Sequence, residues 1–430
     1  MKRPIRVAAI QLRAHGRSEF AQAWPQILSR VRDAAPDAQL LVLPEGTIPA
    51  YVLGEREIDE REIEAAVSDL RALAAKARVV IVAGVASKNA GEVRNGGIVI
   101  DADGSLAGRA DKIFLWHFDR QWFAAGTRLV PISTSLGRLG VLICADGRMP
   151  EIARTLVDRD AELLVMPTAW VSSGRSSDEL ENFQADILGR VRAFENGVPF
   201  VAANKCGVER SMVLYCGKSQ IVDGTGTLVA IAGERAEGTL FATVEIGEAH
   251  PQRAALPRPV ARTPNVTGVA RIAISAQRLP GDIAERMAIL ECAYAIAPGD
   301  AQRIAQLDAD VPLALVDDTT MLDPGVLPAY RRAGYRLALW TTRNAPWTQM
   351  LARARAGESR MYVIVIDAVG KRAFVVDPDH SIVCGTFDDY RIAGCAVDLT
   401  KTEQTLIVPG TDIAEGLERV HAMTMGSQGI

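Results

Sequence analysis

The sequence is poor in histidine and has no closely spaced cysteines. Only five histidines occur among 430 residues. The six cysteines are scattered along the chain: Cys144, Cys206, Cys216, Cys292, Cys384 and Cys395. Without a Cys-x-x-Cys pair, the sequence argues against a zinc site and against a disulfide framework. We therefore expect a reducing, cytoplasmic environment and neither a metal nor another cofactor.

Strong charge and long apolar runs are also missing. The formal net charge is −4 at pH 7, and no long basic run occurs, so nothing supports binding to nucleic acid or to a membrane. No apolar run is long enough to span a bilayer, and the first residues lack the apolar segment of a signal peptide. The composition is typical of a globular protein, and a chain of 430 residues is expected to form two domains.

The first 250 residues alternate between expected strands and expected helices. Strands are expected at residues 5–12, 40–43, 79–86, 97–100, 139–143, 162–166 and 200–204, and helices at 19–34, 57–77, from about 150, and at 178–196. A run of strands around residues 220–244 follows. This order predicts an α/β layered domain.

Prolines recur between residues 251 and 264, which is typical of an extended linker. We therefore assign residues 1–250 to a first domain, 251–266 to the linker and 267–430 to a second domain.

The second domain weakly repeats the first, and the matching segments keep their order. The matched pairs are 271–277 with 6–11, 355–358 with 192–195, and 313–318 with the strand that leads to Glu45. Ordered similarity of this kind indicates an internal duplication. We predict a truncated second copy whose middle is deleted and which carries no catalytic residues.

The segment from Leu139 to Glu151 is the centre of the first domain. A short apolar run ends at Cys144, Asp146 and Gly147 supply turn chemistry, and Pro150 suits the first turn of a helix. A thiol between a strand end and a helix start is expected to have a lowered pKa and nearby backbone N–H groups. A lone cysteine in such a place is more often part of the core, so further residues have to support a catalytic role.

Glu45 and Lys112 supply that support. Each follows a short expected strand, where side chains line clefts, although each alone is more simply explained as a surface residue. Together with Cys144 they provide a carboxylate base, a cation and a thiol. Acyl transfer through a covalent thioester requires these three groups.

The three segments resemble the sequence blocks of the nitrilase (carbon–nitrogen hydrolase) superfamily. The blocks are Leu43-Pro-Glu-Gly46, Asp111-Lys-Ile-Phe-Leu115 and Ile143-Cys-Ala-Asp-Gly-Arg-Met-Pro-Glu151, and they occur in the order of that family. The resemblance covers about residues 4–246. It implies an α/β fold, a four-layer α-β-β-α sandwich, whose members commonly dimerise.

The resemblance implies a role for each residue of the site. Cys144 is the nucleophile, Glu45 the general base and acid, and Lys112 the stabiliser of the tetrahedral oxyanion, with the backbone N–H of Ala145 as a second donor. Many members place a glutamate shortly after the lysine, where this chain has Asp119. Since aspartate is one methylene shorter, we expect its carboxylate to fall short by roughly 1–1.5 Å, enough to affect catalytic geometry.

The substrate is predicted from the neighbours of Cys144. Members that cleave nitriles usually have Cys-Trp-Glu, whereas this chain has Cys-Ala-Asp, so we rank a small amide or N-carbamoyl compound above a nitrile. Arg148 resembles arginines that bind a substrate carboxylate in family amidases, but a structural ion pair explains it equally well. Trp170 and the serine-rich loop after it are expected to line the pocket.

Other readings remain open at this point. The same thioester serves a nitrilase or an acyl transferase. A papain-like Cys–His hydrolase would need His117 or His15 as its base, and a non-catalytic binding protein is a further alternative. We expect the second domain to pack on the first as an intramolecular pseudo-dimer, with further homo-oligomerisation open.

Overall fold

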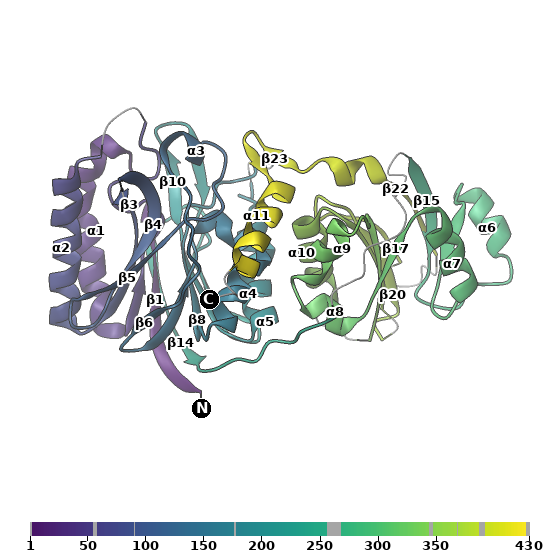
Figure 1. Ribbon diagram of the computed structural model, residues 1–430, viewed down its shortest axis with the longest axis horizontal. Coiled ribbons are helices and arrows are strands. Elements are labelled where there is room, and N and C mark those ends of the chain that lie inside the picture. Colours follow the sequence, from purple (N-terminus) through teal and green to yellow (C-terminus); the bar gives the residue numbers. More distant parts are fainter. Residues whose placement is uncertain are drawn as a thin grey trace. The chain divides into compact units, whose positions relative to one another are not determined.

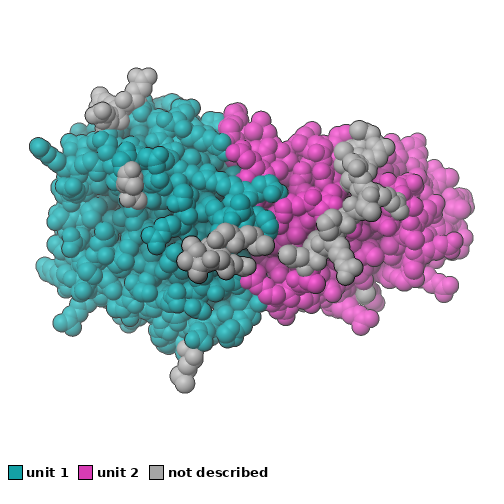
Figure 2. All heavy atoms as spheres, viewed as in Figure 1, with its two compact units in different colours: residues 1–251, 418–430 teal, residues 252–417 magenta. Residues whose placement is uncertain are grey.

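The computed structural model describes residues 2–54, 58–89, 91–175, 178–255, 268–343, 347–367, 369–386 and 392–426. The chain divides into two compact units, which Figure 2 colours separately. Unit 1 comprises residues 1–251 and 418–430, and unit 2 comprises residues 252–417. Most of the predicted linker lies outside the described residues. The segment from residue 418 onward groups with unit 1, whereas the sequence analysis assigns it to the second domain.

Unit 1 is built on two sheets. The first contains eight strands, in which β1 lies between parallel neighbours and also pairs antiparallel with β14 along nine residues. Its strands are β1 (Arg3–Arg13), β2 (Leu40–Val42), β3 (Val80–Asn89), β4 (Glu92–Ile100), β5 (Leu106–Asp111), β10 (Lys205–Glu209), β11 (Val213–Cys216) and β14 (Gly238–Ile246). The second sheet has the order β13-β12-β9-β8-β7-β6. Its strands are β6 (Ile132–Thr134), β7 (Gly137–Val141), β8 (Leu163–Pro167), β9 (Phe200–Ala203), β12 (Gln220–Val222) and β13 (Leu228–Ile231).

Helices cover the outer faces of these sheets. In Figure 1, α1 (Phe20–Ala34) and α2 (Glu60–Ala77) lie on one side, and α4 (Pro150–Asp158) and α5 (Gly189–Asn196) lie on the other. The buried residues of α2 recur at helical spacing, at Ile63, Ala66, Leu70 and Ala74, so one apolar face packs on the first sheet. The predicted four-layer α-β-β-α sandwich is confirmed.

One helix begins later than the sequence predicts. A helix was expected from residue 178, but a π-helical turn (Gln184–Leu188) leads into α5. Asn182 explains the later start, because its Oδ1 accepts the backbone N–H groups of Gln184 at 2.9 Å and Ala185 at 3.2 Å. A side-chain cap of this kind satisfies the open donors of a helix start.

Unit 2 also contains two larger sheets. The first has the order β16-β15-β22 and the second the order β17-β18-β19-β20-β21. Their strands are β15 (Val269–Ile274), β16 (Tyr294–Ile296), β17 (Leu313–Val316), β18 (Leu337–Thr342), β19 (Tyr362–Asp367), β20 (Arg372–Val376), β21 (Ile382–Gly385) and β22 (Ala393–Asp398). A single core cluster takes residues from both sheets, among them Ile272 and Ile364.

The remaining elements of unit 2 are mainly helical. They are α6 (Ile283–Ile289), α7 (Ala301–Asp310), α8 (Asp318–Leu322), α9 (Val326–Arg332) and α10 (Thr348–Ser359), with a small hairpin of β23 (Leu406–Val408) and β24 (Thr411–Asp412). The residues of the last helix, α11 (Ile413–Gly426), are divided between the two units after Leu417. Within the described ranges, no helix has both the length and the hydropathy to cross a membrane.

Candidate active site

Glu45 lies beyond the end of β2, in a turn that β3 approaches closely. Its backbone N–H donates to the carbonyl oxygen of Thr168 at 3.2 Å. On β3, Gly84 lies directly against the turn, and a Cβ there would be 2.2 Å from Pro44 O and 2.5 Å from Glu45 Cα. Any side chain at position 84 would displace the turn, so this glycine lets β3 hold Glu45 in place.

Lys112 lies between two carboxylates in the interior of unit 1. Its Nζ is 2.8 Å from Glu45 Oε1 and 2.6 Å from Asp119 Oδ2, and all three side chains are fully buried. Asn95 Nδ2 also donates to Glu45 Oε1, at 2.6 Å. The second oxygen, Glu45 Oε2, is buried and has no hydrogen-bond partner among the residues that the structure describes. One oxygen of Glu45 is thus used for orientation, and the other is available to accept a proton.

Cys144 begins a short 3-10 helix (Cys144–Arg148) that follows β7. The residue is 7% exposed, and its φ of +46° lies in a region that non-glycine residues rarely adopt. Strained residues of this kind gather at functional sites. The first N–H groups of a helix have no acceptor within the helix, and that of Ala145 is among them.

Asp146 connects the lysine segment to the cysteine segment. Its Oδ1 accepts the backbone N–H groups of Ile113 at 3.0 Å and Phe114 at 2.8 Å, and its Oδ2 accepts that of Ile143 at 3.0 Å. One buried carboxylate therefore fixes the backbone on the C-terminal side of Lys112 against the residue before Cys144.

Asp146→Asn is expected to lower the free energy of unfolding by about 1–3 kcal/mol, because a buried N–H would lose its acceptor and face an amide NH2 instead. Calorimetric unfolding at pH 8 measures the loss. Asp101→Asn is the matched control, since Asp101 also accepts backbone N–H groups, from Ala102 and Ser135. The bonds to Ser135 are exposed, so water can replace them. Equal losses in the two variants would contradict the role given to Asp146.

The electrostatics of the site keep the thiol protonated at rest. Burial and, to a smaller extent, the charge of Glu45 raise the pKa of Cys144 to about 12, against the opposing charge of Lys112, which lowers it. The helix start was expected to lower this pKa; that expectation is wrong, because burial outweighs the local field. Burial also raises the pKa of Glu45, against the opposing charge of Lys112. A thiol with a raised pKa needs a base, and Glu45 and Lys112, rather than a histidine, are the charged groups that most affect it.

The shorter side chain of Asp119 does reach Lys112. A shortfall was expected, but the 2.6 Å contact between Oδ2 and Nζ corrects that expectation at the lysine. Asp119 begins the short helix α3 (Asp119–Trp122), and its N–H closes a turn on Trp116 O at 2.9 Å. This turn fixes the backbone of Asp119 at a position from which the shorter side chain reaches the lysine. Tyr51 OH donates to Asp119 Oδ1 at 2.8 Å and orients the carboxylate.

Arg148 lies against aromatic rings near the end of the 3-10 helix. Its guanidinium carbon is 4.4 Å from the centre of the Trp116 ring and 5.8 Å from that of Phe183. Cation–π contacts of this kind help to position the guanidinium. The predicted role of Arg148 in substrate binding stays a prediction.

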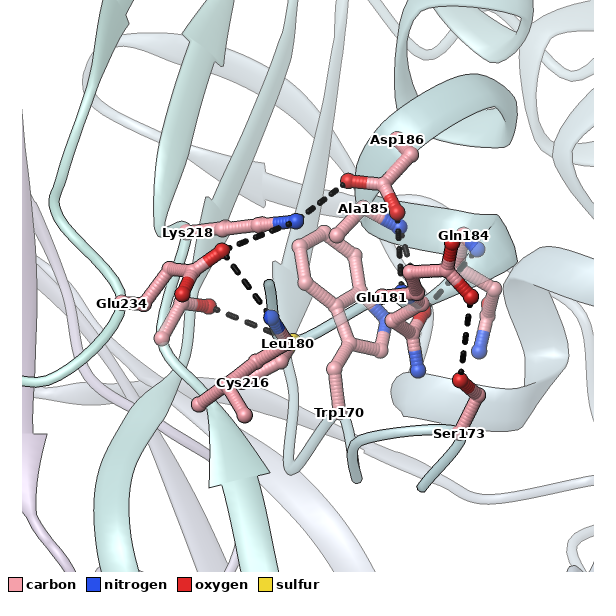
Figure 3. A network of polar contacts seen from close by, with 12 residues as sticks. Trp170, Ser173, Leu180, Glu181, Gln184, Ala185, Asp186, Cys216, Lys218 and Glu234 are labelled. Carbon is pink, nitrogen blue, oxygen red and sulfur yellow. Dashed lines mark hydrogen bonds and ion pairs between the residues drawn. The ribbon is translucent and has the colours of Figure 1, made fainter. Parts of the chain in front are cut away.

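Trp170 is almost completely buried and lies beside the polar network of Figure 3. Its backbone N–H donates to Asn204 Oδ1 at 2.8 Å, and its indole Nε1 has no hydrogen-bond partner in the described part of the chain. A predicted pocket-lining role for Trp170 remains a prediction.

The serine-rich loop after Trp170 is held by the contacts drawn in Figure 3. Ser173 Oγ donates to Glu181 Oε2 at 3.3 Å, and the N–H of Leu180 donates to Glu234 Oε1 at 3.1 Å. Lys218 Nζ lies 2.8 Å from Asp186 Oδ1 and 3.4 Å from the same Glu234 oxygen. Ser173 is therefore tied to the segment before the π-helical turn, and Leu180 to the segment after β13, while Lys218 connects that segment to the turn.

Sequence reasoning did not identify Asn95, Tyr51 or the role of Asp146. Asn95 lies inside a strand and Tyr51 in a loop, and neither stands in a recognisable catalytic pattern. Asp146 was taken as a turn residue only. Their functions depend on which strands become neighbours, and the local sequence contains no signal for that.

This chain is similar in sequence and in fold to known proteins. Residues 6–254 match the sequence profile of the carbon–nitrogen hydrolase family. A probable nitrilase of Schizosaccharomyces pombe is 32% identical over 238 residues, which are 54% of this chain and 85% of that relative. A citrullinase of Francisella tularensis is 28% identical over 271 residues, covering 58% and 92% of the two chains. The crystal structure of an amidase from Nesterenkonia sp. matches with a TM-score of 0.50 at 25% identity, over 57% of this chain and 90% of that one.

An α-β-β-α sandwich with a buried carboxylate, lysine and thiol defines a hydrolase of the nitrilase superfamily. The matched profile spans more than half of the chain, and the protein belongs to the carbon–nitrogen hydrolase family. It is therefore an enzyme that cleaves carbon–nitrogen bonds.

Proposed function

We propose that the protein is a thiol amidohydrolase that cleaves a small, non-peptide amide or N-carbamoyl compound through a thioester on Cys144. One observation carries this proposal. Glu45 has one oxygen held by Lys112 and Asn95, its other oxygen is buried without a hydrogen-bond partner among the described residues, and its charge acts directly on the Cys144 thiol.

The first half of the reaction forms the thioester. Glu45 Oε2 takes the proton of the Cys144 thiol as sulfur attacks the carbonyl carbon of the substrate. The oxygen becomes an oxyanion, which the Lys112 ammonium and the Ala145 N–H stabilise. The protonated Glu45 then gives its proton to the leaving nitrogen, the carbon–nitrogen bond breaks, and ammonia or an amine departs.

The second half hydrolyses the thioester. Glu45 removes a proton from water, and the hydroxyl attacks the thioester carbon through a second oxyanion. When that intermediate collapses, the carbon–sulfur bond breaks and the thiolate takes the proton from Glu45. The Lys112 ammonium stays charged throughout, because Asp119 and Glu45 outweigh the effect of burial and hold its pKa well above the usual value.

A panel of amides, ureas and N-carbamoyl amino acids, assayed for ammonia release, tests the proposal. Hydroxylamine added to the assay should divert the thioester to a hydroxamate. If amines captured the acyl group faster than water did, the enzyme would be an acyl transferase that uses the same thioester. Failure to release ammonia from every member of the panel would contradict the proposal.

Arg148 is proposed to bind a carboxylate of the substrate. It follows Cys144 by four residues, and the rings of Trp116 and Phe183 hold its guanidinium. A planar fork can bind a carboxylate through two parallel hydrogen bonds, which a lysine cannot reproduce.

Arg148→Lys is expected to raise KM for an acidic amide by about tenfold to a hundredfold, which corresponds to the loss of a charge-assisted hydrogen bond. KM for the neutral analogue of the same amide should change little. Steady-state kinetics on the matched pair of substrates measure both effects. Equal losses on the two substrates would show that Arg148 has a structural role instead.

Unit 2 is proposed to be a truncated, non-catalytic copy of unit 1. In its larger sheet, β17, β18 and β19 are parallel and β20 and β21 follow antiparallel, as do β7, β8, β9, β12 and β13 in unit 1. The turns after β12 and β20 also match. Asp223 Oδ1 accepts N–H groups two and four residues later, and so does Asp377 Oδ1.

A buried arginine supports the same correspondence. Arg192 Nε donates to Gly147 O at 2.9 Å and pairs with Glu195, while Arg355 Nε donates to Met321 O at 2.9 Å and pairs with Glu358. This result agrees with the repeat predicted for these two segments.

The registers correct one part of the predicted repeat. When the Asp223 turn is matched to the Asp377 turn, the strand pairing across each sheet makes Gly140 equivalent to Ala314. Asp318 then corresponds to Cys144, because each lies four residues further along the chain. The sequence alone matches Asp318 to Glu45, because both residues follow short apolar strands. An aspartate is not a thiol nucleophile, which supports a non-catalytic unit 2. Its packing on unit 1 stays a prediction.

A further inference from the structure

A second buried ion pair lies near the catalytic one and has no part in the reaction steps. Lys205 Nζ is 3.2 Å from Glu209 Oε2, and both side chains are fully buried. Both residues belong to β10. Burying two charges costs free energy that their mutual attraction only partly returns, so the pair calls for an explanation beyond stability.

Glu209 is hydrogen-bonded through both of its oxygens. Oε1 accepts the backbone N–H of Val52 at 2.8 Å, and Oε2 accepts the hydroxyl of Tyr215 at 2.6 Å as well as Lys205. Lys205 Nζ also lies 5.4 Å from the centre of the Tyr215 ring. The pair therefore holds a loop backbone on one side and an aromatic ring on the other.

Both of these held groups contact Tyr51. Val52 is its neighbour in the chain, and the ring of Tyr215 meets the ring of Tyr51 edge-on, with centres 6.5 Å apart. The turn around Tyr51 is tight, since a Cβ on Gly46 would lie 2.5 Å from the Tyr51 backbone. Tyr51 has little freedom as long as Glu209 holds the segment.

Tyr51 in turn acts on the catalytic lysine. Its hydroxyl donates to Asp119 Oδ1 at 2.8 Å, and Asp119 Oδ2 contacts Lys112 Nζ at 2.6 Å. Burial and the neighbouring carboxylates raise the pKa of Tyr51 well above its usual value, so the hydroxyl keeps the proton that it donates. A continuous series of contacts thus connects Glu209 to Lys112.

We propose that Glu209 and Lys205 form a positioning pair, which holds Tyr51 so that Asp119 and Lys112 keep their places beside Cys144. The inference rests on the proposed function, because Lys112 is taken to act on the sulfur and the oxyanion. Glu209 itself touches neither the thiol nor the substrate position, and it acts through Tyr51.

The alkylation of Cys144 by iodoacetamide provides a test that needs no substrate. Lys112 lowers the pKa of Cys144, so a displaced lysine leaves less thiolate and slows alkylation. The rate constant for Cys144 is measured by peptide mass spectrometry from pH 6 to pH 10. The full-length variants are Glu209→Gln, Tyr215→Phe, Tyr51→Phe and their pairwise combinations.

Glu358→Gln is the matched control. Glu358 belongs to the buried pair with Arg355 in unit 2, whereas the catalytic cluster belongs to unit 1. This variant should lose stability but alkylate Cys144 at the rate of the unchanged protein. It separates the effect of opening a buried ion pair from the effect of displacing Lys112.

Glu209→Gln and Tyr51→Phe are each expected to slow alkylation about tenfold at a fixed pH, a size typical of residues that are coupled in one hydrogen-bond network. Each should also shift the pH profile of the alkylation rate to higher pH. Tyr215→Phe should act in the same direction but more weakly. Because Glu209 acts through Tyr51, the double variant Glu209→Gln/Tyr51→Phe should be no slower than Tyr51→Phe alone.

Several results would overturn the inference. They are an unchanged rate in folded Glu209→Gln, additive effects in the double variant, or a Cys144 that does not alkylate in the unchanged protein. If Glu209→Gln does not fold, the double variant Tyr215→Phe/Tyr51→Phe tests the inference in its place. Additive effects of these two substitutions would likewise reject the inference. A failure of the proposed function is separate, because it shows as a lack of ammonia release while these alkylation rates can still be compared.

Discussion

Cys144→Ala is expected to abolish ammonia release from every amide that the unchanged protein hydrolyses. The substitution removes the sulfur that forms the thioester, and no other group of the site can replace it. The loss should reach the detection limit, several orders of magnitude, because nucleophile, base and oxyanion donors act as one unit. The melting temperature should change by only a few degrees, since the sulfur is small and the neighbouring contacts of Asp146 are made without it.

Two further variants make this result specific. Cys144→Ser keeps the shape of the site but has a far weaker nucleophile, and it should retain at most a trace of activity. Cys384→Ala is the control, since it lies in unit 2 and should keep full activity. Iodoacetamide should inactivate the unchanged protein in step with labelling of Cys144. Substantial turnover by Cys144→Ala or Cys144→Ser would reject the thioester mechanism.

Glu45→Gln is expected to lower kcat by about a hundredfold to ten-thousandfold, the contribution of a positioned general base and acid. Glutamine has the same shape and retains an oxygen for Lys112 and Asn95, so the structure should survive while the proton acceptor is lost. Lys112→Ala should have an effect of similar size, together with a clear loss of stability, because it leaves Glu45 and Asp119 buried without their cation.

Combining variants tests whether these residues form one unit. In the double variant Glu45→Gln/Cys144→Ala, the residual rate should equal that of Cys144→Ala, because a base has no task without its nucleophile. The Asn95 amide offers the control, since Asn95→Ser removes only one hydrogen bond to Glu45 Oε1 and should reduce kcat far less than Glu45→Gln. Loss of activity in Asn95→Ser as large as in Glu45→Gln would mean that orientation, rather than proton transfer, dominates.

The reactive groups could be identified from the sequence because each one follows a short strand. Glu45, Lys112 and Cys144 all stand beyond strand ends, and such positions are determined by patterns over a few neighbouring residues. The layered α/β architecture followed from the same patterns. The order of the three blocks then resembled that of the nitrilase superfamily.

The distances and energies at the site were decided by tertiary structure. Asp119 reaches Lys112 from a backbone position that a turn at Trp116 fixes, and the Cys144 pKa rises because the folded chain excludes water from the thiol. Tyr51 reaches Asp119 and Asn95 reaches Glu45 from segments distant in sequence, and Glu209 holds Val52 beside Tyr51. The proposed equivalence of Asp318 and Cys144 likewise rests on the strand register. Local patterns specify which element forms, but which elements become neighbours depends on the packing of the whole chain, and reach, burial and register all depend on those neighbours.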